Sequence, residues 1–155
     1  YLLIRKIYER AGSPTDVVLE DGTPLVDALM APTRLYVKPV LSLLGSNRAD
    51  IHGMAHITGG GLTENIIRVV PDGLGLDIDA TSIVLPPVFA WLKAAGNVAD
   101  AEMWRTFNCG IGFVLIVPAA STQAVEAAIQ ALGLAHRQIG RVVADAGNGE
   151  RVHIG

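Results

Sequence analysis

A run of three glycines stands inside the segment HITGGGLTEN at residues 56–65, between a short apolar run and a helical pattern. Glycine brings no side chain and costs backbone entropy, so we expect these glycines to admit a close ligand rather than to serve packing. A glycine loop at a helix start presents unpaired N–H groups and the positive end of the helix dipole, which favour an anion such as phosphate. Thr58, Gly59, Gly60 and Gly61 are therefore predicted to contact a phosphate, and a tight turn without a ligand is the alternative.

The glycine loop matches neither of the two common nucleotide-binding patterns. A Walker A loop ends in Lys followed by Ser or Thr, and these residues are missing after Gly61. The spacing does not fit Gly-x-Gly-x-x-Gly either. The sequence therefore supports neither a P-loop nor a Rossmann-type dinucleotide site.

Three polar residues flank the glycine loop. His56 adjoins it and is a candidate for a substrate contact, whereas His52 lies four positions earlier and would share its strand face. No third ligand is obvious beside the two histidines, so two half-buried polar residues are favoured over a metal site. Asn65 suits the orientation of an amide-like substrate. For Glu64, a charge–dipole contact is the simplest interpretation, and a metal or proton contact is the alternative.

A second glycine-containing segment, TFNCGIG at residues 106–112, leads into the most hydrophobic stretch of the chain. Asn108 or Cys109 could point into a cleft there. Cys109 is expected to be a small buried hydrophobe, because no neighbouring base is visible that would activate a thiol. Earlier in the chain, Arg34 could bind a phosphate through two guanidinium N–H groups, and Lys38 could bind one as a point charge. Alternatively, both side chains could be solvated cations.

The hydrophobic periodicity indicates the elements that must position these residues. Helices are expected at 1–11, 25–30, 62–70, 86–95, 100–106 and about 121–132, with another ending near 44; strands are expected at 51–57, 74–78, 112–117, 135–144 and 151–154. Asp100 and Ser121 are expected to cap helices. The strand at 112–117 should be central and buried, and the last two strands should form a closing hairpin. The pattern predicts one α/β (α+β) domain in which helices cover a mixed sheet.

Composition narrows the class of protein. The chain has 155 residues, of which 50 % are hydrophobic and 17 % charged, which suits one domain with a full core. A net charge of −3 without a Lys/Arg run argues against a nucleic-acid partner. The single cysteine fits a reducing compartment, and no apolar stretch approaches the roughly 20 residues that span a bilayer. The high hydropathy leaves two explanations open: apolar surface covered by a partner or missing domain, or a large core.

Four segments resemble the phosphoribosylformylglycinamidine cyclo-ligase (aminoimidazole ribonucleotide synthetase) family. They are PTRLYVK at 32–38, the glycine-loop region at 55–66, AGN at 95–97 and the segment at 103–112. Their order and spacing match the family's C-terminal domain across nearly the whole of residues 1–155, and the opening YLLIRKI resembles the helix that begins the family's second half. Residues 141–155 continue past this shared core, as in some relatives.

The resemblance implies an ATP-dependent reaction of de novo purine synthesis in the cytoplasm. The family uses ATP to activate the formyl amide oxygen of formylglycinamidine ribonucleotide. An internal nitrogen then attacks, phosphate leaves, and the ring of aminoimidazole ribonucleotide closes. The family is implied to act as a homodimer that needs Mg²⁺. Its N-terminal domain, absent from this chain, would supply most of the ATP and metal site and of the dimer contact, so the chain alone should be inactive.

The resemblance also suggests which residues form the cleft. The loop from Thr58 to Gly61 would contact a phosphate of substrate or nucleotide, helped by Arg34, and His56, Asn65 and Asn108 would line the same cleft as catalytic candidates. No metal ligand is expected in this half. Methionine is also common in the family at the position of Cys109, which argues against an essential thiol.

Two other classes of protein stay open. One is a non-catalytic phosphate- or nucleotide-binding module. The other is a related two-domain ATP-dependent amidotransferase that acts on glutamine. The RTFNCGIG string at residues 105–112 favours the cyclo-ligase over the amidotransferase. Acidic metal ligands and a lysine for ATP in the N-terminal half would favour the enzyme over the binding module.

Overall fold

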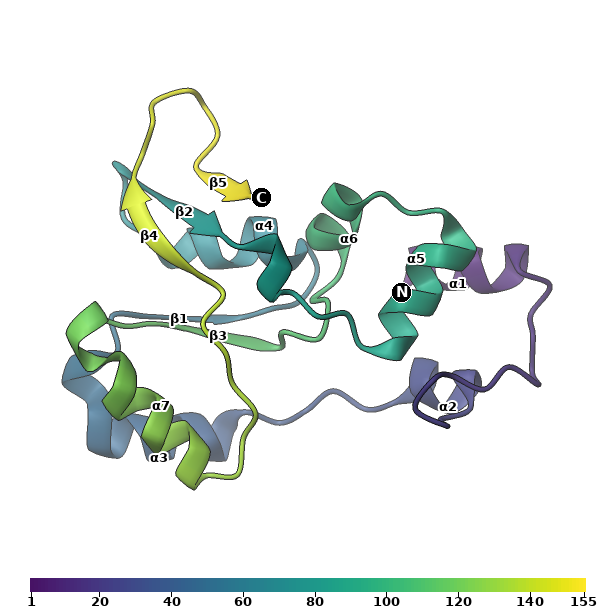
Figure 1. Cartoon of the computed structure of the whole chain (residues 1–155), viewed down its shortest axis with the longest axis horizontal. Coiled ribbons are helices and arrows are strands. Elements are labelled where there is room, and N and C mark those ends of the chain that lie inside the picture. The colour runs from purple at the N-terminus through teal and green to yellow at the C-terminus, as the bar shows by residue number, and fades with distance from the viewer.

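A two-stranded antiparallel ribbon runs through the middle of the molecule (Figure 1). The computed structural model describes residues Tyr1 to Gly155, and in it β1 (Gly53–His56) pairs with β3 (Phe113–Ile116). The expectation of a central strand at 112–117 is wrong, because β3 has one hydrogen-bonded neighbour and is half-buried along its length. Helices lie on one side of the ribbon and a second sheet lies on the other (Figure 1).

The second sheet has three strands in the order β4-β2-β5. The central strand β2 (Leu74–Ile78) pairs antiparallel with β4 (Gly140–Ala144) and parallel with β5 (Val152–Ile154). The prediction of mixed parallel and antiparallel pairing is confirmed, but the strands form two sheets instead of one. The predicted closing hairpin of the last two strands is wrong, because β2 lies between β4 and β5. Gly75 permits this arrangement, since a Cβ there would lie 2.7 Å from the Arg151 carbonyl oxygen.

Seven helices surround the sheets: α1 (Leu2–Arg10), α2 (Leu25–Met30), α3 (Val37–Asn47), α4 (Gly61–Asn65), α5 (Pro87–Gly96), α6 (Asp100–Thr106) and α7 (Thr122–Ala131). Short 3-10 turns occupy Arg48–Asp50, Ile66–Val69, Ala80–Ser82 and Ala119–Ser121. The helix expected at 62–70 is thus a short α-helix that continues as a 3-10 turn. No helix is long and apolar enough to cross a membrane.

Of the two predicted helix caps, Ser121 is confirmed as the N-cap residue of α7, whereas the prediction for Asp100 is wrong. Asp100 lies inside α6, where Ala99 is the N-cap residue, and it forms an ion pair with Lys93 of α5. Ser121 precedes α7 without a capping bond, and its hydroxyl donates to the Asp50 carboxylate over 2.6 Å. The Ser121 hydroxyl is thus engaged by a carboxylate 71 positions away rather than by the helix end.

Two hydrophobic cores lie side by side, and the glycine loop runs between them. The first core holds buried residues of β1, α4 and β2, among them Ile57 and Leu62. The second is formed by α1, α5 and α6 around the fully buried Met103. The Trp104 side chain packs against both cores. Ile57 and Leu62 are thus anchored in one core on either side of the loop, which fixes both of its ends.

Candidate functional site

Two loops leave the same end of the ribbon. His56 at the end of β1 pairs with Phe113 at the start of β3, and the Ile57 N–H donates to the Gly112 carbonyl over 2.9 Å. The glycine loop after β1 and the segment 107–112 before β3 therefore lie next to each other. This arrangement brings together four groups singled out in the sequence: His56, the glycines, Asn65 and Asn108.

The three glycines of the loop differ in what a side chain at each position would contact. A Cβ on Gly61 would overlap the Trp104 carbonyl oxygen, so this glycine lets α4 pack against the end of α6. The expectation that the glycines do not serve packing is wrong at this position. Gly60 has φ +95°, and a Cβ there would meet the Glu64 side chain at 2.7 Å. Gly59 alone has open space where its side chain would be and no left-handed backbone. It is therefore the loop position most accessible to a ligand.

The Asn65 side chain holds the glycine loop from inside. It is 6 % exposed, and its Nδ2 donates to the carbonyl oxygens of Thr58 (3.4 Å), Gly59 (3.2 Å) and Gly61 (2.8 Å). The Thr58 hydroxyl donates to its Oδ1 over 3.5 Å. The amide expected to orient a substrate is thus engaged with the loop.

This arrangement decides where the loop's N–H groups point. In a trans peptide the C=O and N–H bonds point in opposite directions, and the chain has no cis peptide. With the Thr58 and Gly59 carbonyls turned toward Asn65, the N–H groups of Gly59 and Gly60 are turned away from it. Neither N–H donates to an acceptor within the chain. Because α4 has only five residues, these two amides, rather than a helix dipole, are what the loop offers an anion.

An aromatic cluster adjoins the loop. The exposed His56 ring lies 6.2 Å from Phe113 and 5.7 Å from Tyr36, measured between ring centroids. Tyr36 immediately precedes α3, and its ring lies 5.2 Å from that of Phe113. His52 is exposed, precedes β1 and takes no part in this cluster.

Arg34 borders the same region. Its side chain is exposed and forms no ion pair within the chain. With Tyr36 and residues 110–113 it lines one wall of a mostly apolar groove of about 780 Å³, which runs between the ribbon, α3, α7 and the second sheet. Neither the residues of the glycine loop nor Lys38 line this groove.

The segment around Asn108 is a tight turn. The Asn108 Oδ1 accepts from the Gly110 N–H over 3.0 Å, while its Nδ2 has no partner in the chain. The expectation of a buried Cys109 is confirmed, and its Sγ donates to the Met103 carbonyl over 3.5 Å. Burial raises the pKa of the Cys109 thiol to about 11, and the nearby Asp100 charge adds to this effect. The thiol is therefore neutral near pH 7.

Glu64 forms ion pairs with two arginines. Its carboxylate lies 3.6 Å from the Arg105 guanidinium and 3.9 Å from that of Arg68. No group of three His, Cys, Asp or Glu side chains in the chain could hold a metal ion. The two arginines leave the Glu64 carboxylate neutralised at the edge of the glycine loop.

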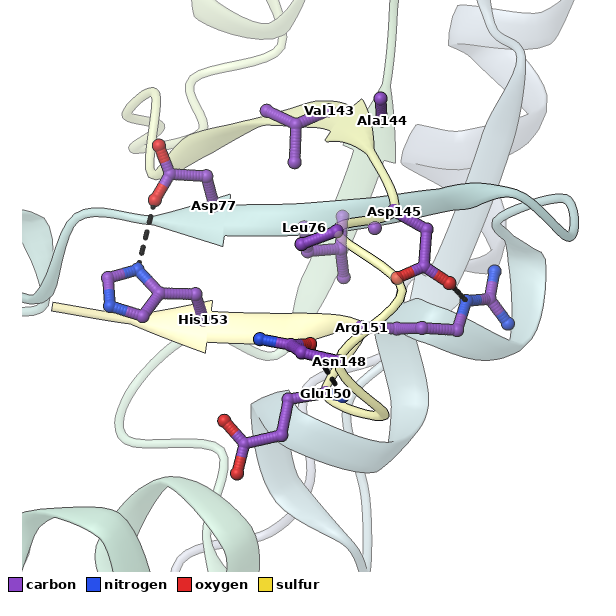
Figure 2. A pocket seen from close by; sticks show the side chains of 11 residues that line it. Leu76, Asp77, Val143, Ala144, Asp145, Asn148, Glu150, Arg151 and His153 are labelled. Atoms are coloured by element: carbon purple, nitrogen blue, oxygen red, sulfur yellow. Dashed lines mark hydrogen bonds and ion pairs between the residues drawn. The ribbon is translucent and has the colours of Figure 1, made fainter.

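A smaller depression of about 300 Å³ lies on the outer face of the second sheet, away from these residues (Figure 2). In it the His153 Nδ1 lies 3.1 Å from Asp77, and Arg141 also contacts this carboxylate. These hydrogen bonds, from His153 first and then Arg141, lower the pKa of Asp77. Figure 2 also shows Arg151 turned toward Asp145. The Asp77 carboxylate, on the central strand of the sheet, is thus hydrogen-bonded by two neighbours.

Sequence reasoning missed Tyr36 and Phe113 as neighbours of His56. An available signal was the glycine at position 112, because a Cβ there would overlap the Tyr36 hydroxyl oxygen. A glycine at the start of an apolar strand points to a bulky side chain lying across it. Its partner is separated by more than seventy positions and cannot be identified from spacing alone.

The fold and this site define an α/β domain that presents a glycine loop and a cluster of aromatic rings at one end of a ribbon. The chain belongs to the AIR synthase related protein family, whose C-terminal domain model matches residues 1–153. The resemblance and the α/β fold class expected from the sequence are both confirmed.

Relatives over the whole chain support the same family. The chain is 70 % identical over 155 residues to the phosphoribosylformylglycinamidine cyclo-ligase of Xanthomonas campestris pv. campestris (strain 8004), covering 100 % of this chain and 45 % of that protein. It is 62 % identical to the protein of that name from Xylella fastidiosa (strain 9a5c), of which it covers 44 %. The crystal structure of tt0281 from Thermus thermophilus is 25 % identical with a TM-score of 0.54, over 86 % of this chain and 41 % of that one. The chain thus spans somewhat less than half the length of these proteins.

Proposed function

We propose that residues 1–155 are the C-terminal domain of an ATP-dependent cyclo-ligase that converts formylglycinamidine ribonucleotide to aminoimidazole ribonucleotide in cytoplasmic purine synthesis. The observation that carries the proposal is the 70 % identity along the entire chain to a cyclo-ligase. Because the chain covers 45 % of that relative, we expect a separate N-terminal domain to complete the active site and to mediate a homodimer. We therefore expect the chain alone to have no cyclo-ligase activity.

In this proposal the glycine loop binds a phosphate of the substrate or of ATP. The outward N–H groups of Gly59 and Gly60 and the unpaired guanidinium of Arg34 are donors that fit a phosphate. Phosphoryl transfer is catalysed mainly by positioning and by stabilising the charge on phosphate oxygens, which such donors do without rearrangement. ATP, when bound, supplies the phosphoryl group that makes the formyl oxygen a leaving group.

The remaining candidates take roles that their geometry supports. His56 contacts the substrate beside the loop, and the unpaired Nδ2 of Asn108 donates a hydrogen bond into the same cleft. Asn65 acts through the loop, as a positioning residue. The chain offers no cluster of acidic side chains for Mg²⁺, so we expect the N-terminal domain to bind this ion.

Reconstitution tests the proposal. The chain is supplied with formylglycinamidine ribonucleotide, ATP and Mg²⁺, alone and together with the separately produced remainder of the Xanthomonas campestris relative. We expect aminoimidazole ribonucleotide and ADP only when both halves are present. Turnover by the chain alone would contradict a split active site. Turnover in neither mixture, with both pieces folded and associated, would favour a non-catalytic binding module.

A further inference from the structure

The turn between β4 and β5 contains a pair of residues found nowhere else in the chain, an asparagine followed by a glycine. Asparagine occurs at positions 47, 65, 97, 108 and 148, and only the last of these precedes a glycine, Gly149. In the other four cases the next residue carries a side chain that shields its backbone nitrogen. Glycine has no side chain, so the Asn148 amide carbon can approach the Gly149 nitrogen.

The groups on both sides of this approach are exposed and without a partner in the chain. Asn148 and Gly149 are both exposed, and the Gly149 N–H donates to no backbone acceptor. The Asn148 Oδ1 accepts from the Glu150 N–H over 3.0 Å, whereas its Nδ2 donates to no group (Figure 2). Asn65 is the opposite case, since it is buried and its Nδ2 donates to three carbonyls. Exposed turns of small and polar residues are also where the backbone moves most freely.

These two groups can react with each other in water alone. Hydroxide removes the Gly149 amide proton, and the nitrogen attacks Asn148 Cγ. The new N–Cγ bond forms as the Cγ–Nδ2 bond breaks, and Nδ2 leaves as ammonia. Water then opens the cyclic imide at one of its two carbonyls. Opening at Cγ gives aspartate, whereas opening at the α-carbonyl gives isoaspartate, in which the main chain runs through Cγ and is one carbon longer.

We propose that Asn148 is a modification site at which the chain deamidates spontaneously, and that the isoaspartyl product loosens strand β5. The Arg151 carbonyl, soon after the turn, accepts from the Leu76 N–H over 2.7 Å. The backbone of Gly75 packs so closely there that a Cβ would lie 2.7 Å from the same oxygen. A longer main chain at position 148 must shift this contact, because the turn also loses the Oδ1 acceptor of Glu150 to the new peptide link.

Peptide mapping by mass spectrometry, on the chain aged at pH 7 and at pH 9, tests the modification site. The peptide with residue 148 should gain the mass difference between a hydroxyl and an amino group, about tenfold faster than the peptide with exposed Asn97. The rate should rise with pH, because hydroxide removes the amide proton. The Asp-Gly pairs at 21–22 and 72–73 can form the same ring without a change in mass. A residue 148 peptide that reacts no faster than that of Asn97 would overturn the proposal.

Hydrogen exchange separates the effect of the longer backbone from that of the new charge. In the aged chain the amides of β5 and Leu76 should exchange about tenfold faster than in the fresh chain. Asn148→Asp carries the carboxylate on a normal backbone and should exchange like the fresh chain. Asn148→Gln forms the ring far less readily, because its side chain is one carbon longer, and ageing should not change it.

The two parts of the proposal can fail separately. Mass gain at residue 148 with unchanged exchange would keep the modification site and overturn the loosening of β5. Equally fast exchange in freshly prepared Asn148→Asp would overturn the role of the longer backbone and assign the effect to charge. Faster exchange in aged Asn148→Gln would place its cause outside residue 148 and overturn the link between the two.

Discussion

Single atoms decide what each residue of the glycine loop does. Gly59 and Gly61 stand two positions apart in the same triplet, yet a Cβ on Gly61 would overlap the Trp104 carbonyl and a Cβ on Gly59 would meet nothing within 4 Å. Packing therefore explains one glycine and leaves the other free for ligand approach. This difference makes the two positions a matched pair for experiment.

Gly59→Ala should leave the free energy of unfolding within about 0.5 kcal/mol of the unmodified chain, because its new methyl group lies in open space. Gly61→Ala should lose about 3 kcal/mol or more through backbone overlap. Urea unfolding measures both. In the reconstituted enzyme Gly59→Ala should still raise KM, since the methyl group stands where a phosphate would approach; an unchanged KM would argue that the loop meets no ligand.

Asn65 carries the second prediction at this scale. Asn65→Asp exchanges a buried donor to three carbonyls for a carboxylate that repels them, so we expect a loss of about 3 kcal/mol or more on urea unfolding at pH 7. Asn148→Asp is the control, because Asn148 only accepts, from the Glu150 N–H, and a carboxylate keeps that bond. Equal stability of the two variants would mean that the Asn65 amide does not hold the loop.

At the scale of elements, local patterns located the segments but not their partners. The alternation of Leu74, Leu76 and Ile78 predicted β2 with the bounds that it has. The pairing of β2 with both β4 and β5 depends on contacts more than sixty positions apart, which no local pattern encodes. The predicted hairpin failed for this reason, and the candidate site was predictable only where its residues are contiguous, as at 56–61.

The attachment of β5 yields a prediction of its own. The strand has three residues and lies at a sheet edge, but the Arg151 guanidinium donates to the carbonyls of Pro71 (2.7 Å), Leu74 (2.9 Å) and Val70 (3.0 Å). Arg151→Met should leave these acceptors without their donor, lower the melting temperature, and speed amide exchange in β5 and its β2 partners. Arg141→Met, which removes one exposed ion pair with Asp77, should change little. Unchanged exchange at β5 in Arg151→Met would show that backbone pairing alone holds the strand.

At the scale of the whole molecule, apolar surface gathers on one stretch of chain. Leu35 is 83 % exposed, Met30 78 %, Val37 67 % and Leu41 63 %, all between the end of α2 and the middle of α3. The high mean hydropathy of the sequence had two possible explanations, a large core or apolar surface that a partner covers. Four of the eight large apolar side chains that are at least 63 % exposed lie in this one segment, which favours the covered surface.

Under the proposed function, the N-terminal half is what covers this stretch, and the last prediction tests that arrangement. The double variant Leu35→Lys, Leu41→Lys should make the isolated chain less prone to self-association, because two exposed apolar side chains become charged. It should weaken binding to the separately produced remainder at least tenfold, since burying an ammonium without a partner is costly. Val18→Lys, at a residue 63 % exposed in the loop before α2, is the control and should leave association unchanged. Sedimentation velocity of the mixtures measures both effects. If the double variant still associated tightly, the interface would lie elsewhere on the domain. The segment from Met30 to Leu41 would then be exposed surface without a partner.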